Sequence, residues 1–178
     1  MKKSILMPLG AILLAAVVLF GASMGLNNLA NKNAQEEHIR TMKTLLPGSE
    51  TFVVEPYTGE DTNIRKVHKG ETGFVIETAT QGYAGEISML IGVSNEGTVT
   101  GLQVREMKET LGLGGNALTD CEFLAQFLKT SGDAEVGTNV DAITGATVTS
   151  NAVTRCVNSA AAYVTGADVQ TGATEWGG

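Results

Sequence analysis

The sequence predicts an α+β domain that follows a membrane anchor. Three observations support this: a charge-free apolar stretch near the N-terminus, β-rich segments in the middle of the chain, and amphipathic helical patterns around them. Strands that follow one another, with helices outside them, are typical of an antiparallel sheet with helices packed against it. After the anchor, the chain of 178 residues is long enough for one domain with its own core.

The N-terminal segment is expected to span a membrane. Residues 4–30 contain no charged side chain, and a helix needs about 20 apolar residues to cross a bilayer. A cleaved signal peptide is the alternative, but its apolar region is usually only about 7 to 15 residues long. Positive charges flank the segment nearly equally, with Lys2 and Lys3 before it and Lys32, Arg40 and Lys43 after it. The very short tail, with its charges directly at the membrane edge, favours residues 1–30 as a cytoplasmic tail and a single anchor, with the following domain outside the cytoplasm.

A helical stalk is expected after the anchor, over residues 31–48. The helix itself covers residues 31–46, and Pro47 and Gly48 end it. Its few apolar side chains are spaced to form one face: Ile39, Met42, Leu45 and Leu46. The stalk is expected to lead the chain away from the membrane.

Three strands are expected in the domain that follows, which we place at residues 49–166. They cover residues 74–78, 87–93 and 99–107, which are rich in β-branched side chains and separated by turn residues. The last two are predicted to form a hairpin, because Asn95-Glu96-Gly97 is a three-residue connection in which Gly97 supplies a positive φ.

Two helices are expected after the strands. The first begins at Thr119, which has capping-box spacing to Glu122, and continues to Thr130. Its expected buried face comprises Phe123, Leu124, Phe127 and Leu128. The second ends near Gly166 and carries one apolar stripe at helical spacing: Val153, Cys156, Val157, Ala160, Ala161 and Val164. Residues 167–178 form a C-terminal tail.

Small residues and hydroxyl groups are concentrated directly before the second helix. Residues 141–150 read Asp-Ala-Ile-Thr-Gly-Ala-Thr-Val-Thr-Ser. Free N–H groups in the first turn of a helix, and the positive end of its dipole, favour an anion there. Bound phosphate is therefore one interpretation. The other is that Thr147 or Thr149 is an ordinary N-cap.

The same ten residues resemble the site at which flavin mononucleotide (FMN) is esterified through its phosphate to a threonine. The family it resembles is the FMN-binding G subunit of Rnf-type electron transport complexes, with the C subunit of the sodium-pumping NADH:quinone reductase as a relative. The resemblance implies that Thr147 carries the flavin covalently. It also implies flavin contacts by the other motif residues: Asp141, Thr144, Gly145, Ala146, Val148 and Thr149.

A second segment resembles the same family. Residues 109–114 read Glu-Thr-Leu-Gly-Leu-Gly, where the family has Glu-Thr-Pro-Gly-Leu-Gly. This implies further flavin contacts by Glu109, Thr110, Gly112 and Leu113. Leu111 replaces the proline, and Met107 stands where many members have histidine, so the rigidity of this loop and its closeness to the flavin are in question.

A near-copy of the acceptor motif lies at the C-terminus. Residues 168–174 repeat five of its first seven positions at the same spacing, and Trp176 then stands where the first copy has Thr149. Only residues 175–178 follow, too few to form a helix behind a phosphate, and terminal residues are usually poorly ordered. Thr147, rather than Thr174, is therefore the predicted acceptor.

The charge balance and the histidines argue against other classes of function, and the cysteines leave a disulfide open. Removing Lys2 and Lys3 from the 12 basic residues leaves 10 against 19 acidic ones, which argues against binding of nucleic acid. The two histidines, His38 and His68, show neither a metal-binding nor a triad pattern, so no metal site is expected. Both cysteines, at positions 121 and 156, are expected to be buried in helices, and a disulfide between them stays open.

The resemblance, together with the predicted anchor, implies a membrane-anchored flavoprotein component of an Rnf-type ion-translocating complex, located in the cell membrane, that relays electrons through FMN. The resemblance implies a flavin transferase for its maturation, and other membrane and redox subunits as partners. Two alternatives keep the flavin: a component like the C subunit of the quinone reductase, and a free-standing surface electron shuttle. A third is a tethered scaffold without flavin, in which Thr147 only caps its helix.

Overall fold

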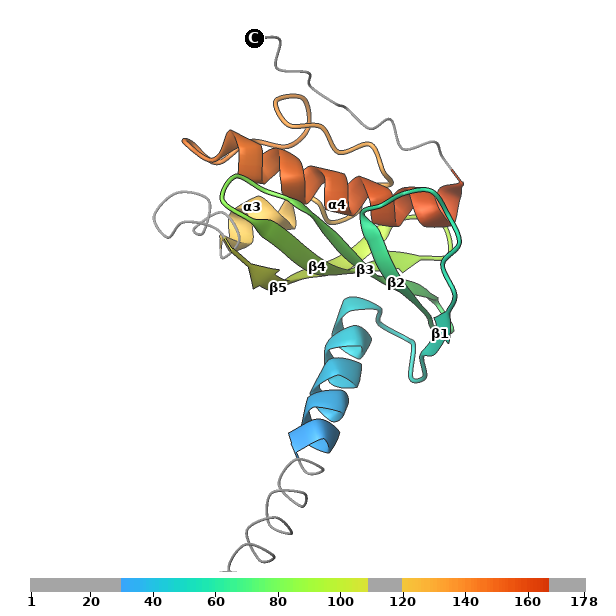
Figure 1. The fold of residues 1–178 in the computed structure, drawn as a ribbon. Coiled ribbons are helices and arrows are strands. Elements are labelled where there is room, and N and C mark those ends of the chain that lie inside the picture. Colours follow the sequence, from blue (N-terminus) through green and yellow to red (C-terminus); the bar gives the residue numbers. More distant parts are fainter. Residues whose placement is uncertain (1–29, 109–119, 167–178) are drawn as a thin grey trace, which may run out of the picture. The chain divides into compact units, whose positions relative to one another are not determined.

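The computed structural model describes residues 30–108 and 120–166 (Figure 1). The chain divides into two compact units between Arg40 and Thr41, and the second unit contains the sheet. The predicted anchor, the loop at 109–119 and the C-terminal near-copy lie outside the described residues. Among the residues described, no helix has both the length and the apolar character needed to cross a bilayer.

Five antiparallel strands form one sheet in the order β1-β2-β3-β4-β5. Each strand pairs with the next one in the sequence, so the sheet is a meander. The strands are β1 (Val53–Glu55), β2 (Ile64–Lys69), β3 (Gly73–Gln81), β4 (Glu86–Ser94) and β5 (Val99–Met107). The last three confirm the strands expected from the sequence, whereas β1 and β2 were not expected.

The hairpin between β4 and β5 is confirmed. The N–H of Ser94 donates to the carbonyl of Thr98 at 2.8 Å. Gly97 has a φ of +84°, as the connection requires. The pairing is irregular between Gly92 and Val93, so the strands leave the turn with a bulge.

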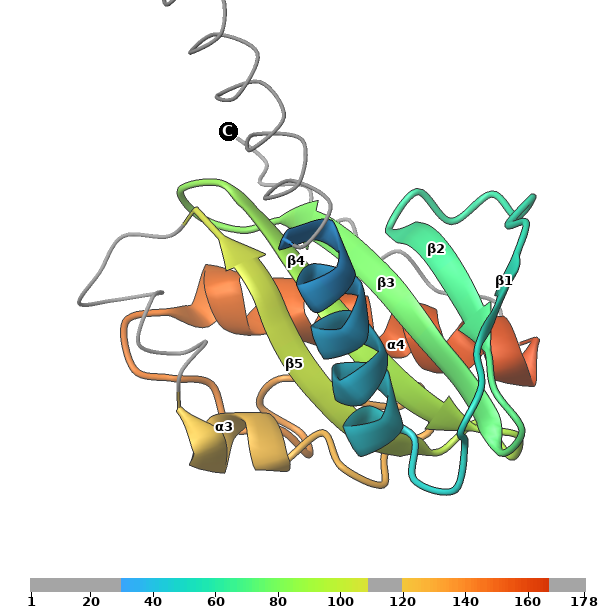
Figure 2. The same ribbon diagram turned by 90° about the horizontal axis from the view of Figure 1, so that it is seen from below.

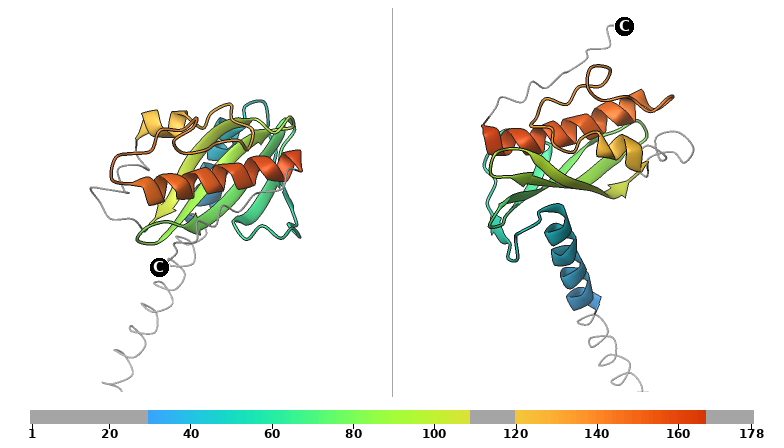
Figure 3. Two further views of the ribbon diagram at one scale, coloured as in Figure 1. Left: turned by 90° about the horizontal axis from the view of Figure 1, so that it is seen from above. Right: turned by 180° about the vertical axis from the view of Figure 1, so that it is seen from behind.

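Helix α4 (Thr147–Thr165) lies across one face of the sheet, as Figures 1 and 3 show. The predicted stripe is confirmed: Val153, Cys156, Val157, Ala160 and Ala161 are fully buried, and Val164 is partly buried. They share one core with the side chains that β3 and β4 direct to this face, including Ile76, Met89 and Ile91. The helix ends at Gly166, whose φ of +69° is the left-handed conformation typical of a helix C-terminus.

The opposite face of the sheet carries a smaller core. A helix covers residues 30–45, close to the expected bounds (Figure 2). Met42 and Leu45 of this helix, and Leu46 directly after it, pack on Val75 and Leu90 of the sheet. The hydroxyl of Thr100 in β5 donates to the carbonyl of Leu45 at 2.6 Å. The end of the expected stalk is therefore part of the domain core, while Ile39 is 37% exposed.

Helix α3 (Cys121–Ala125) is shorter than expected. Its N-cap is Asp120, so the prediction of a capping box formed by Thr119 and Glu122 is wrong. Continuation to Thr130 is also wrong, because the chain leaves the helix to pair with the start of β5. The N–H of Val99 donates to the carbonyl of Thr130, and that of Lys129 to the carbonyl of Val99, both at 2.9 Å. Of the expected buried face, Phe123 and Phe127 are buried, Leu124 is partly buried and Leu128 is 43% exposed.

Candidate functional site

The first turn of α4 is left without a side-chain cap. Its N-cap is Ala146, which makes no capping hydrogen bond, so the interpretation of Thr147 or Thr149 as an N-cap is wrong. The N–H of Ser150 donates to the carbonyl of Ala146 at 2.9 Å and begins the helical ladder. By helix geometry, the N–H groups of Thr147, Val148 and Thr149 therefore have no acceptor within the helix.

A tight turn precedes this open helix end. The N–H of Ala146 donates to the carbonyl of Ile143 at 2.9 Å, and Gly145 has a φ of +79°. A positive φ at the third position of a four-residue turn is the requirement of a type II turn, which glycine meets without strain. The glycine of the motif thus brings the chain into the helix at the point where the free N–H groups begin.

The motif divides into exposed and buried residues. Asp141, Thr144, Gly145, Thr147 and Val148 are exposed, and Val148 is 43% exposed. The other two predicted site residues, Ala146 and Thr149, are buried. The buried side chain of Thr149 is therefore not placed to meet an anion. The backbone N–H of Thr149, in the first turn of α4, is. The hydroxyl of Thr147 lies on an exposed residue, where an enzyme can reach it.

Two residues that the sequence did not single out hold this loop. The side-chain amide of Gln126 binds both backbone groups of Asp141: it accepts from the N–H at 2.7 Å and donates to the carbonyl at 3.4 Å. The hydroxyl of Ser150 accepts from the N–H of Ile143 at 3.2 Å and donates to the carbonyl of Ala146 at 3.0 Å. Ser150 is the last residue of the ten-residue motif, but no sequence pattern pointed to Gln126.

These groups fit a phosphate ester on Thr147. Free N–H groups, the positive end of a 19-residue helix and the absence of acidic residues from its first turn all favour an anion. Gly145 adds no side chain beside them. The loop residues Glu109, Thr110, Gly112 and Leu113 lie outside the described residues, so their contacts with the flavin stay a prediction.

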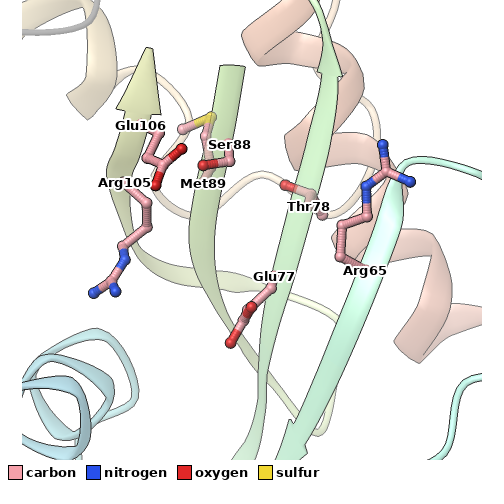
Figure 4. A pocket seen from close by; sticks show the side chains of 7 residues that line it. All are labelled: Arg65, Glu77, Thr78, Ser88, Met89, Arg105 and Glu106. Carbon is pink, nitrogen blue, oxygen red and sulfur yellow. The ribbon is translucent and has the colours of Figure 1, made fainter. Parts of the chain in front are cut away.

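A small hollow lies elsewhere, over strands β2 to β5 (Figure 4). Its volume is about 190 Å³, and seven residues line it: Arg65, Glu77, Thr78, Ser88, Met89, Arg105 and Glu106. Pockets that enclose drug-sized ligands are usually about 300 to 1,000 Å³. The hollow contains none of the predicted flavin residues and is small for a flavin, so it gives no alternative to the α4 site.

The remaining candidate residues are the two cysteines and His68. Neither cysteine forms a disulfide; Cys156 is buried in α4 as expected, but Cys121 is exposed at the start of α3, and its expected burial is wrong. Burial raises the pKa of the Cys156 thiol to about 11. His68 is buried in β2, and its Nε2 lies 2.9 Å from a carboxylate oxygen of Glu77 in β3.

Known proteins are similar to this chain over the domain that contains the sheet and α4. The FMN-binding domain family matches residues 82–162, which include the whole acceptor motif. The G subunit of the ion-translocating oxidoreductase complex of Methanosarcina acetivorans is 36% identical over 145 residues, which cover 72% of this chain and 76% of the relative.

Two further relatives are covered over little more than half their length. The G subunit of the Na(+)-translocating ferredoxin:NAD(+) oxidoreductase complex of Acetobacterium woodii is 34% identical, with 62% of this chain and 58% of the relative covered. The G subunit of the proton-translocating ferredoxin:NAD(+) oxidoreductase complex of Clostridium ljungdahlii is 37% identical, with 52% and 53% covered. The crystal structure of Shewanella oneidensis NqrC aligns at 19% identity with a TM-score of 0.45, over 71% of this chain and 73% of that chain.

Proposed function

Because the chain belongs to the family of G subunits of ion-translocating oxidoreductase complexes, we propose that it carries FMN covalently, through a phosphoester to Thr147. The observation that carries this proposal is the start of α4. An exposed hydroxyl stands on the first residue of a long helix whose N-cap offers no side-chain hydrogen bond. An esterified phosphate would supply the acceptors that the free N–H groups lack.

Each part of the loop has a role in this arrangement. Thr147 would provide the oxygen of the ester, and the N–H groups of the first turn of α4 would hold the phosphate. Gln126 and Ser150 fix the backbone on both sides of Gly145, so the N–H groups are oriented before the phosphate is attached. The bound flavin supplies one- and two-electron redox chemistry, and the protein attaches and orients it.

At the level of the assembly, we propose an electron relay. The relatives are named as subunits of complexes that translocate ions, two of them as ferredoxin:NAD(+) oxidoreductases. By this relationship the chain would pass electrons between other redox subunits of an Rnf-type complex. It would be anchored in the cell membrane by residues 4–30, with its domain outside the cytoplasm. A flavin transferase would mature it.

The experiment is expression of the full chain with a flavin transferase, followed by denaturing gel electrophoresis under ultraviolet light. We expect a fluorescent band, and a peptide containing residue 147 that carries the mass of FMN. Thr147→Val removes the hydroxyl at nearly constant volume, so this peptide should lose the flavin while the domain stays folded.

Thr138→Val is the matched control, because Thr138 is an exposed threonine outside the motif. This variant should keep the flavin on residue 147. An unmodified peptide from the wild-type chain, after expression with an active transferase, would contradict the proposal and favour the scaffold without flavin.

A further inference from the structure

We propose that Tyr83 stacks against the isoalloxazine ring of the flavin and forms the ring-binding part of the site. The proposal rests on the proposed function, because it places the ring of an FMN attached to Thr147. Tyr83 lies in the connection between β3 and β4, residues 82–85, which reads Gly-Tyr-Ala-Gly. Its 73% exposure is the highest among the exposed large apolar residues of the described chain.

The β3–β4 connection lies beside the first turns of α4, as Figures 1 and 3 show. A guanidinium nitrogen of Arg155 in α4 donates to the carbonyl of Gln81, the last residue of β3, at 3.0 Å. Thr147 lies two turns before Arg155 in the same helix, which corresponds to about 12 Å along the axis. An extended FMN has a comparable length, so a flavin attached to Thr147 can reach the connection.

One side of α4 leads from the acceptor motif to this connection. Val148, Asn151 and Arg155 follow one another at helical spacing, so they lie on one side of the helix. Val148 and Asn151 are exposed and Arg155 is partly exposed, so the described chain leaves this side accessible. A flavin that contacts Val148, as the resemblance implies, and extends along this side therefore meets the connection that carries Tyr83.

The connection is held from two sides. Arg155 binds it to α4, and the N–H of Lys108, directly after β5, donates to the carbonyl of Glu86 at 3.3 Å. The N–H of Gly82 donates to the carbonyl of Gly85 at 2.8 Å and closes the turn. A Cβ on Gly85 would lie 2.5 Å from the Cβ of Lys108, so this close approach requires glycine. The exposed ring is thus presented from a fixed backbone.

An exposed tyrosine on such a backbone suits a flat aromatic ligand. Tyrosine offers a large apolar face and loses little conformational freedom when that face is covered. Offset stacking of two aromatic rings is favourable beyond the burial of their area, and the phenol hydroxyl can stay in contact with water. The β3–β4 connection therefore supplies what the start of α4 lacks, which is a surface for the ring rather than for the phosphate.

The test is the fluorescence of the native full chain after FMN has been attached to Thr147. An excited isoalloxazine takes an electron from a tyrosine ring that it touches and then returns it, so contact quenches emission and leaves both groups unchanged. Tyr83→Leu removes the stacking ring and should raise the native emission severalfold and weaken the visible circular dichroism of the flavin. Tyr83→Phe keeps a stacking ring but donates electrons poorly, so it should raise the emission and keep the circular dichroism.

Tyr163→Phe is the matched control, because it removes a phenol hydroxyl in the last turn of α4, where the hydroxyl donates to Glu55. This variant should keep the wild-type emission. Intact mass and fragment masses verify one flavin on residue 147 in each protein. Wild-type emission and circular dichroism in both loaded Tyr83 variants would overturn the stacking and leave Thr147 as the acceptor. A wild-type chain that takes up no flavin on residue 147 would overturn the proposed function and this contact with it.

Discussion

Helices α3 and α4 begin in opposite ways. At the start of α3, one carboxylate oxygen of Asp120 accepts from the N–H groups of Glu122 and Phe123, at 2.9 and 3.2 Å. At the start of α4, the N-cap is Ala146, which makes no side-chain hydrogen bond. The short helix is thus capped by a carboxylate from its own sequence, whereas the long helix has no side-chain acceptor at its N-cap.

Burial explains why the open end is tolerated. A missing N-cap costs a helix about 1 kcal/mol. Helix α4 has 19 residues, and eleven of them are buried. Helix α3 has five residues and buries only Phe123. Because packing stabilises α4 along its length, its first turn does not need a cap, and the residues there are available to bind a cofactor.

The largest effect that we expect from this difference in burial is alkaline destabilisation through Cys156. Its pKa is raised by burial from 9.0 to about 11, so the folded state favours the neutral thiol. This stabilisation is fully present below pH 9 and is lost as the pH rises from 9 to 11. It amounts to at most about 2.7 kcal/mol. Urea unfolding of protein without flavin, from pH 7.5 to 10.5, measures it.

Cys156→Ala is the control, because it removes the titrating group from α4. The difference in unfolding free energy between the wild type and this variant should shrink above pH 9. Cys121→Ala, which removes the exposed thiol at the start of α3, is the matched control for loss of a thiol. A wild-type profile parallel to that of Cys156→Ala would show that the thiol is not protected by the fold.

The two helices also show what could be predicted from the sequence. Helix α4 was predicted closely, because its apolar stripe repeats at helical spacing and its end carries Gly166. The end of α3 was predicted wrongly, because it depends on pairing of residues 129–130 with Val99, about 30 positions away. No local pattern encodes such a contact. The helical periodicity of Phe127 and Leu128 therefore suggested a continuation that the fold does not allow.

The first two strands were missed for a related reason. Strand β2 reads Ile-Arg-Lys-Val-His-Lys, and its pairing with β3 shifts between Ile64 and Lys66, so polar and apolar residues do not alternate. Strand β1 has three residues, and two of them are exposed valines. It is held by partners distant in sequence: Glu55 forms an ion pair with Lys69 at 3.3 Å and accepts from the hydroxyl of Tyr163 at 3.4 Å.

At the candidate site, the sequence supplied the proposed acceptor and predicted the helix behind it, but it did not indicate the residues that support them. Thr147 and Gly145 belong to a contiguous motif, so they can be read from the chain directly. Gln126 lies 15 positions before Asp141, and its role appears only when the fold brings α3 beside the loop. A single glutamine in a helical region has no sequence feature that distinguishes it from a solvent-exposed one.

The second prediction concerns the open end of α4 directly. If a phosphate completes this end, attachment of FMN to Thr147 should stabilise the domain by about 1 to 2 kcal/mol through the helix dipole. The comparison is between protein loaded with FMN on residue 147 and the same protein without flavin. Because the dipole interaction is electrostatic, part of the gain should disappear in 1 M salt. A gain that does not depend on salt would place the stabilisation in contacts of the flavin ring instead.

The smallest effect is expected at the closed end. Asp120→Ala removes the acceptor of two N–H groups and should cost about 1 kcal/mol in urea unfolding. Asp120→Asn keeps an oxygen acceptor and should cost less. Because the proposed ester lies at the start of α4 and not of α3, both variants should accept FMN on Thr147 at the wild-type rate. A slower transfer to Asp120→Ala would mean that the transferase senses α3 through Gln126, and that the two helix starts do not act independently.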